Sequence, residues 1–151
     1  MSAKISTGLA GLLLTTAGLK EALTGVHLYA YAGAEPASAD AALGSATLLC
    51  DYSGNGDGSA LLLAANAANG QIEKDATQVW QGTAVAGANA AGPATFFRFA
   101  MPADTGDAST SAVRLQGTIG NVGKELNLNN TTMADGAVQT ITDFFFAQPT
   151  A

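Results

Sequence analysis

The spacing of apolar residues changes near residue 26, from a helical period to an alternating one. Over residues 2–24, four apolar side chains recur about once per helical turn: Ile5, Leu9, Leu12 and Leu13. We therefore predict a helical segment here, with Ser6 or Thr7 as its N-cap. Gly18 is expected to divide the segment into a longer helix and a short one over residues 19–23, which ends at the C-cap Gly25.

From residue 26 onward, alternation predicts β-strands. Eight runs fit this pattern, at residues 26–31, 43–50, 61–65, 78–86, 94–101, 113–119, 126–129 and 137–146. The runs 78–86 and 94–101 are expected to form a β-hairpin across the loop GANAAGP. The Pro-containing stretch 33–45 is expected to be a loop, and residues 51–59 a turn.

This succession of short predicted strands after a helical segment predicts a mainly β (α+β) fold. We expect a β-sandwich or barrel-like body of about seven to eight strands with an N-terminal helical segment. Residues 1–25 would form the helical segment and residues 26–151 the β-rich body, within one domain overall.

Two runs of consecutive aromatic residues would place aromatic side chains on both faces of a strand, although only one face of a strand points into a single core. In the run FFRF, Phe97 and Phe99 lie on one face of the predicted strand, and Phe96 lies on the other with Arg98. Either a second layer of the domain covers Phe96, or an exposed aromatic beside an arginine marks an interface. The run of three phenylalanines at 144–146 presents the same choice.

Composition narrows the classes of partner. Charged residues make up 12% of the 151 residues, the net charge is −6, and the six basic residues are scattered singly. Nucleic-acid binding requires clustered Lys and Arg, so we expect none. The low charge leaves two interpretations open, a surface partly covered by a partner or a solvated surface of Ser, Thr, Asn, Gly and Ala.

Groups able to do chemistry are sparse. Cys50 is the only cysteine, so an intrachain disulfide is excluded. His27 is the only histidine, so no catalytic dyad can use another one. A buried inert thiol is the favoured interpretation of Cys50, and a Cys50–His27 nucleophile pair is the alternative. The carboxylates are spread along loops. We expect no enzyme activity and no cofactor.

One turn has the beginning of a calcium-binding pattern. Asp51, Ser53, Asn55 and Asp57 place oxygen atoms at alternate positions around a glycine. The carboxylate that an EF-hand loop requires at its twelfth position is replaced by Leu62. A solvated turn is therefore favoured over a calcium site, and we expect no metal.

The N-terminal segment imitates a signal peptide, with Lys4 before an apolar stretch and small residues. The apolar run is much shorter than the roughly 20 residues that a membrane span requires. We expect neither a targeting signal nor a membrane partner.

The order of these blocks resembles a family of small virion proteins of tailed bacteriophages. The matching blocks are the helical segment, the strand 26–31, GAEPASADAA (33–42) with Leu48 and Leu49, Trp80 with Gly82 and Ala84, Gly92 with Phe96, Phe97 and Arg98, LQGTIG (115–120) with Gly123, and a last strand after Asp135 and Gly136. Residues 50–76 match nothing in that pattern. The blocks 36–42 and 115–120 are the most specific.

The resemblance implies a non-enzymatic structural protein of the virion, assembled in the host cytoplasm. The first choice is a head decoration (cement) protein that binds the major capsid protein or other virion proteins, as a homo-oligomer with a trimer favoured. The alternative is a tail or baseplate component, with Tyr29 and Tyr31 available to stack on host-surface glycans. A small hydrolase is the third hypothesis.

Ten residues are the candidate interface contacts. The helical segment is expected to pack either on its own domain or along a neighbouring subunit, and the exposed aromatics and the turn at Pro36 are expected to touch partners. The candidates are Leu9, Leu12, Leu13, Tyr29, Tyr31, Pro36, Phe96, Arg98, Phe144 and Phe146.

Overall fold

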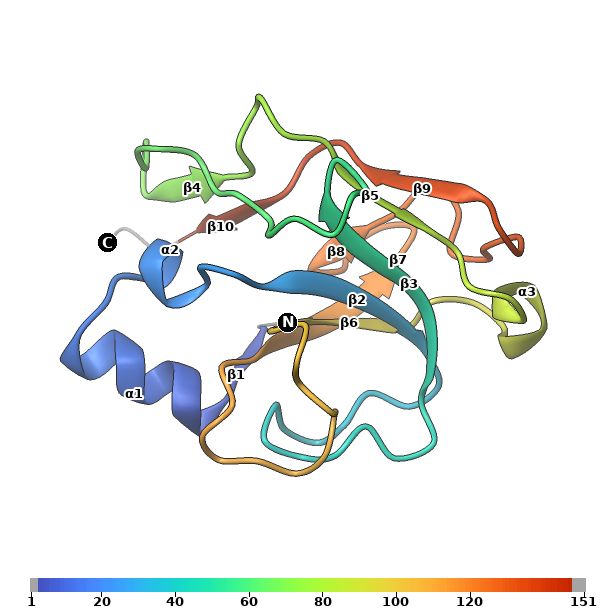
Figure 1. Ribbon diagram of the computed structural model, residues 1–151, viewed down its shortest axis with the longest axis horizontal. Helices are drawn as coiled ribbons and strands as arrows, with labels where there is room; N and C mark the ends of the chain where they lie inside the picture. The colour runs from blue at the N-terminus through green and yellow to red at the C-terminus, as the bar shows by residue number, and fades with distance from the viewer. Residues whose placement is uncertain (1–2, 148–151) are drawn as a thin grey trace.

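The computed structural model describes residues 3–147, and within this range the protein is mainly β, as predicted (Figure 1). Three short helices and ten strands follow one another as β1 (Lys4–Ile5), α1 (Thr7–Thr15), α2 (Leu19–Ala22), β2 (His27–Ala32), β3 (Thr47–Gly54), β4 (Gln71–Glu73), β5 (Trp80–Thr83), α3 (Ala88–Ala91), β6 (Phe96–Ala100), β7 (Leu115–Gly120), β8 (Leu126–Asn127), β9 (Val138–Ile141) and β10 (Phe145–Ala147). The N-terminal helical segment is also confirmed.

Most strands belong to one open sheet in the order β1-β7-β6-β2-β3-β5-β9, with β8 added to β7 in parallel. The other pairs in this sheet are antiparallel. The long strand β3 joins the two halves of the sheet, because residues 47–52 pair with β2 and residues 53–54 pair with β5. Strands β4 and β10 form a separate two-stranded sheet.

The core lies between the main sheet and the small sheet. Phe97 and Phe99 point inward from β6, as the alternation predicts, and Trp80 meets Phe99 edge-on at 5.9 Å between ring centroids. Phe144 lies 5.6 Å from Trp80, and Phe146 lies 5.7 Å from Phe99. The C-terminal aromatics therefore close the core from the side of β10.

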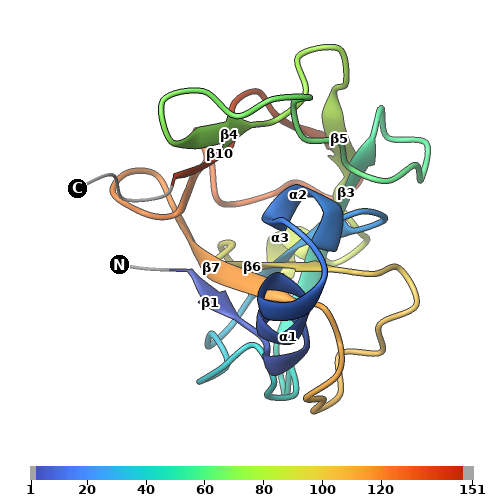
Figure 2. The ribbon, with the colours of Figure 1, turned by 90° about the vertical axis from the view of Figure 1, so that its left-hand side faces the viewer.

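The helical segment is shorter than predicted. Ser6 is the N-cap of α1, where its side chain accepts a hydrogen bond from the Leu9 amide at 3.0 Å, and Gly18 separates α1 from α2. The expectation that the helical segment starts at residue 2 is wrong for Lys4–Ile5, because these residues pair with β7 as strand β1. Figure 2 shows the two helices side by side against one end of the β-body.

The predicted hairpin between residues 78–86 and 94–101 is wrong. Strand β5 lies between β3 and β9, whereas β6 lies between β2 and β7. Gly82 allows β5 to approach β3, because a Cβ atom there would lie 2.1 Å from the Asp51 carbonyl oxygen. Alternation identified both strands, but it carries no information about which strand each one pairs with.

Three further boundaries differ from the prediction. Residues 51–54, expected in a turn, continue β3, and the expected strand 61–65 makes only an isolated bridge from Leu63 to Lys74. The expected strand 137–146 is two strands, since β9 pairs with β5 and β10 pairs with β4. Strand β4 was missed, because its three residues carry too little alternation.

Candidate interaction surface

The face of β2, β6 and β7 opposite the core is covered by the chain itself. Two loops, 33–46 and 101–114, lie over it, and we call them the loop pair. Phe96 and Arg98 beneath them are 0% and 1% exposed. For the run FFRF, the structure confirms the alternative in which a second layer of the domain covers Phe96. The Phe96 ring stacks on that of Tyr31, with 5.0 Å between the ring centroids.

Arg98 and Gln116 hold the first loop to the sheet. They are cross-strand neighbours on β6 and β7, and the Arg98 Nη2 and Nε groups donate to Gln116 Oε1 at 2.8 and 3.2 Å. Arg98 Nη2 also donates to the Ala41 carbonyl at 3.1 Å. Gln116 Nε2 donates to the Pro36 carbonyl at 2.8 Å and to Glu35 Oε1 at 3.2 Å. Two buried side chains thus fix both ends of the stretch 35–41.

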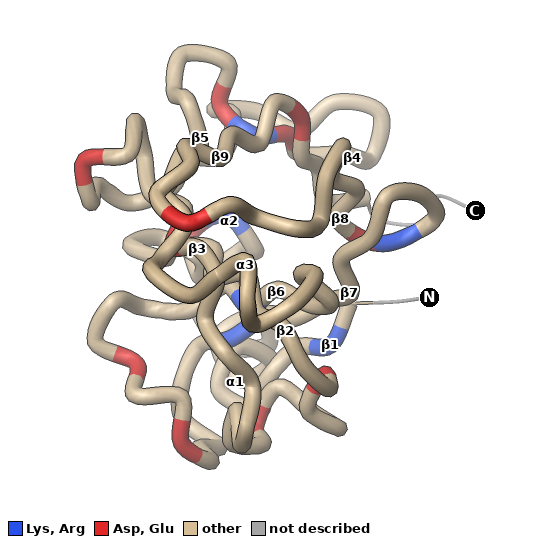
Figure 3. Tube along the Cα trace, turned by 90° about the vertical axis from the view of Figure 1, so that its right-hand side faces the viewer, with Lys and Arg blue, Asp and Glu red and all other residues tan. Residues whose placement is uncertain are grey.

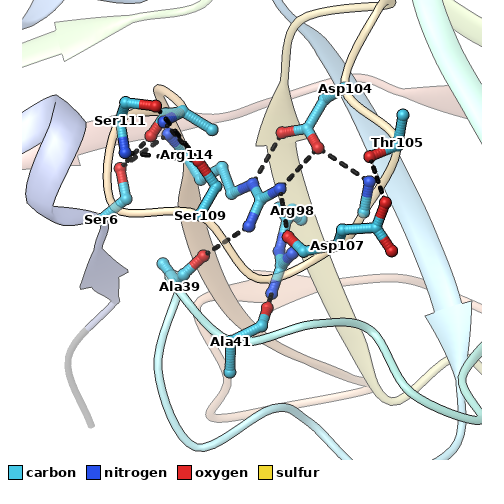
Figure 4. Close-up of polar contacts among 12 residues, drawn as sticks. Ser6, Ala39, Ala41, Arg98, Asp104, Thr105, Asp107, Ser109, Ser111 and Arg114 are labelled. Atoms are coloured by element: carbon cyan, nitrogen blue, oxygen red, sulfur yellow. Dashed lines mark hydrogen bonds and ion pairs between the residues drawn. The ribbon is translucent and has the colours of Figure 1, made fainter.

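Arg114 holds the second loop and joins it to the first (Figure 4). Its Nε and Nη2 groups donate to the two carboxylate oxygens of Asp104, both at 2.6 Å. The same guanidinium donates to the Asp107 carbonyl at 2.8 Å and to the Ala39 carbonyl at 3.3 Å. Such a two-pronged pair is both strong and directional.

Burial and hydrogen bonding shift the pKa of Asp104 in opposite directions. Burial tends to raise the pKa of its carboxyl, but the hydrogen bonds from Arg114 and from the Gly106 amide bring the pKa below its ordinary value. The hydrogen bonds to Asp104 likewise raise the pKa of Arg114. Both groups are therefore charged across the neutral range and stabilise each other.

The N-terminus of α1 is tied into the same network. Ser6 Oγ donates to the Ala112 carbonyl at 2.7 Å and accepts from the Arg114 amide at 3.0 Å. Asp40 in the first loop accepts from the amide of Thr7 at 2.8 Å and from its hydroxyl at 2.6 Å. Helix α1, the loop pair and β7 consequently form one connected unit.

This arrangement anchors loops. Within residues 3–147, Arg98 has no carboxylate within salt-bridge distance, and its Nη1 group has no hydrogen-bond partner. Burial accordingly lowers the pKa of Arg98. The Ala41 carbonyl of the first loop and Gln116 Oε1 accept the hydrogen bonds of this buried charge, so the position of the loop is coupled to it.

The outer side of the loop pair is a shallow, open depression. Small and hydroxyl-bearing residues line it, together with one carboxylate: Ser38, Asp40, Ala41, Ala108, Ser109, Thr110 and Ser111. The Ser109 amide donates to the Asp40 carbonyl at 2.8 Å across this depression, and the Leu43 amide donates to the Gly106 carbonyl at 2.9 Å. The two loops therefore present one continuous surface.

Cys50 and His27 do not form a pair. Cys50 lies in the core, while the His27 ring lies 2.8 Å from Asp51 Oδ1 through Nδ1 and 3.2 Å from the Gly58 carbonyl through Nε2. Because neighbouring residues of a strand face opposite sides, the contact of His27 with Asp51 separates it from Cys50. Burial raises the pKa of the Cys50 thiol to about 12.

We expect the Cys50 thiol to be unreactive in the folded protein. At neutral pH the raised pKa lowers its thiolate fraction roughly 1,000-fold relative to an ordinary cysteine, and only the thiolate is nucleophilic. Ellman's reagent should label native protein slowly and urea-unfolded protein at once. The His27→Ala variant should give the same slow native rate, and fast native labelling that this variant abolishes would instead revive the dyad.

The side-chain oxygens of the calcium-like turn are engaged by groups of the protein itself. Asp51 contacts His27, Ser53 Oγ accepts from the Gly58 amide at 3.0 Å, and Asp57 Oδ1 accepts from the Ser59 amide at 2.9 Å. Asn55 Oδ1 accepts from the Val79 amide at 3.1 Å. Among residues 3–147, no group of three or more His, Cys, Asp or Glu side chains is arranged to hold a metal ion.

The ten candidate contacts divide by burial. Leu9, Tyr31, Phe96, Arg98 and Phe144 are buried inside the chain's own fold, which leaves them little or no surface for a partner. Half-buried are Leu12, Leu13, Tyr29, Pro36 and Phe146. The most exposed large apolar side chains were not among the candidates: Leu14, Val122, Val138 and Phe145. Leu14, Val138 and Phe145 are apolar residues at outward positions of a helix or strand, whereas Val122 lies in the loop between β7 and β8.

Three further observations concern membrane spans, the distribution of charge and similar proteins. None of the helices within residues 3–147 is long and apolar enough to cross a membrane. Figure 3 shows the Lys and Arg positions interspersed with Asp and Glu positions along the trace. Comparison with protein-family models, with curated proteins and with solved structures finds no match to this chain.

Proposed function

We propose that this protein is a structural component of a tailed-phage virion, a decoration protein that binds and stabilises the head lattice. The observation that carries the proposal is the loop pair, which buried arginines lock onto the sheet. Three of the blocks behind the phage resemblance, 33–42, 96–98 and 115–120, are segments that this network joins. Part of the resemblance therefore rests on residues that build one surface.

A rigid surface suits this role. Association costs free energy for every loop that has to be ordered, and a loop already held by hydrogen bonds avoids that cost. The Arg98 and Arg114 anchors hold both loops before any partner arrives. The net charge of −6 fits an external position without contact to packaged DNA. The partner in this proposal is the major capsid protein, with a trimer as the favoured oligomer.

The tail or baseplate alternative is less well supported by the site. Glycan binding there would use Tyr29 and Tyr31 as stacking platforms. Tyr31 is 8% exposed and already stacked on Phe96. Tyr29 is half-buried and its ring is stacked on that of His27, so neither ring is a free platform. We therefore keep the head location as the proposal.

Binding to phage heads tests the proposal directly. Purified protein, added to heads that lack it, should co-sediment with them to saturation and raise the temperature at which they release DNA. Thr110→Arg places a long charged side chain on the loop pair and should weaken binding at least tenfold. Val122→Arg, at an exposed position outside the loop pair, should bind like wild type. Recovery in tail fractions alone would select the alternative, and absence from all particles would overturn both.

A further inference from the structure

Two asparagines in the chain are followed by a glycine, Asn55 by Gly56 and Asn69 by Gly70. In such a pair the backbone nitrogen of the glycine can attack the side-chain carbonyl carbon of the asparagine, because glycine has no Cβ atom to hinder the approach. Both pairs share one backbone form, with φ of 56° and 52° at the asparagines and 70° and 73° at the glycines. Any difference in their reactivity in the folded protein therefore depends on the contacts around them.

Asn55 is held through both its backbone and its side chain. Its amide donates to the Val79 carbonyl at 2.6 Å, and its Oδ1 atom accepts from the Val79 amide at 3.1 Å. The Gly56 amide, which would be the nucleophile, donates to the Ser53 carbonyl at 3.5 Å. The attacking nitrogen and the side chain that it would attack are thus both engaged, and both have to be released before they can react.

The hairpin tip around Asn69 is held only by its own backbone. Residues 65–70 are all exposed, and the backbone hydrogen bonds of the tip run between Ala68 and Gln71, at 2.8 and 2.9 Å. Within residues 3–147, neither the Gly70 amide nor the Asn69 side chain has a hydrogen-bond partner. Segments with exposed backbone and few contacts open locally at a low cost in free energy, so this tip can reach the geometry that the attack requires.

Two aspartates, Asp57 and Asp135, also precede a glycine, but their side chains are engaged and ionised. Asp57 Oδ1 accepts from the Ser59 amide at 2.9 Å, and the two oxygens of Asp135 accept from the Gly87 and Asn89 amides at 2.8 and 2.9 Å. These hydrogen bonds hold the pKa of both carboxyls below its ordinary value. Because a carboxylate repels an attacking electron pair, neither aspartate competes with a carboxamide as the site of attack.

We propose that Asn69 is a site of spontaneous deamidation in the folded protein. The Gly70 amide nitrogen forms a bond to Cγ of Asn69, and the bond from Cγ to the side-chain nitrogen breaks. That nitrogen takes up the proton lost from the amide and leaves as ammonia. Water then opens the succinimide at either carbonyl, which leaves aspartate or isoaspartate and adds a negative charge to the tip. The reaction needs only water, so it holds or fails independently of a virion location.

Peptide mapping of the full chain after storage at mildly alkaline pH tests the proposal. The tryptic peptide 21–74 contains both asparagine–glycine pairs, so fragment-ion mass spectrometry compares the two sites within one molecule. Conversion at Asn69 should be at least about tenfold faster than at Asn55, a ratio that about 1.4 kcal/mol of extra protection at Asn55 produces. A digest at zero time gives the background. In urea, where the contacts of Asn55 are lost, the two rates should converge. Equal native rates, or no conversion at Asn69 until urea is added, would overturn the proposal.

Two matched variants identify the source of the product. Asn69→Gln keeps a side-chain amide but has to form a larger ring, which is much slower. This variant should remove the isoaspartate that an isoaspartyl methyltransferase detects in stored native protein. Asn55→Gln, the same change at the other pair, should leave that signal at the wild-type level, and circular dichroism checks that both variants fold. A signal that survives Asn69→Gln and is lost in Asn55→Gln would place the reaction at Asn55 and contradict the proposal.

Discussion

Replacing Arg114 with alanine is expected to lower the free energy of unfolding by about 3–5 kcal/mol. The substitution leaves the buried Asp104 carboxylate without its two-pronged partner, and it removes the donors to the Ala39 and Asp107 carbonyls. Side-chain exposures of 2% for Arg114 and 8% for Asp104 mean that little water can replace these bonds. Urea titration followed by the fluorescence of Trp80 and by far-UV circular dichroism measures the loss.

Two variants calibrate this result. Lys4→Ala breaks a comparable but partly exposed pair with Glu35, and it should cost less than about 1 kcal/mol. Arg114→Lys keeps the charge but loses the planar fork, so its cost should lie between the two. A cost for Arg114→Ala no greater than that for Lys4→Ala would show that the buried network does not anchor the loop pair.

The same ion pair has a definite pH dependence. The pKa of Asp104 is lower in the folded protein than in the unfolded chain. Its contribution to the free energy of unfolding is therefore fully present above the unfolded pKa of about 3.9, and it is lost as the pH falls through the folded pKa. The stability difference between wild type and Arg114→Ala should therefore be constant near neutral pH. It should shrink as the pH falls below about 4.

Replacing Trp80 with alanine should also lower the free energy of unfolding by about 3–5 kcal/mol. Trp80 is fully buried and touches both Phe99 and Phe144, so its removal leaves a cavity where the main sheet meets the small one. Because Trp80 is the only tryptophan, thermal or urea unfolding has to be followed by circular dichroism.

Trp80→Phe is the matched control for this prediction. The indole Nε1 group is buried without a hydrogen-bond partner among residues 3–147, and an unsatisfied buried donor costs about 1–3 kcal/mol. Phenylalanine loses volume but removes that cost, so this variant should be much closer to wild type than Trp80→Ala. Equal destabilisation by the two variants would indicate that the indole N–H is satisfied in solution.

The candidate site was only partly predictable from the sequence. Alternation placed Phe96 and Arg98 together on one face of β6, and turn residues predicted the first loop, but nothing local indicated what covers them. The bonds from Arg98 and Arg114 to the first loop go to the backbone carbonyls of Ala41 and Ala39, at least 57 residues away. Because every residue has a backbone carbonyl group, the residue type does not predict which carbonyl accepts such a bond.

The sequence by itself determined the mainly β class, the choice of Ser6 or Thr7 as N-cap, the break at Gly18 and the inward face of Phe97 and Phe99. Each of these depends on neighbours a few residues apart. Only the tertiary structure decided that β5 pairs with β3 and β9, that the chain's own loops cover Arg98, and that β9 ends the strand order of the main sheet. Strand partners and loop packing bring together residues far apart in the chain. That choice depends on the summed packing of the whole domain, which short-range periodicity does not encode.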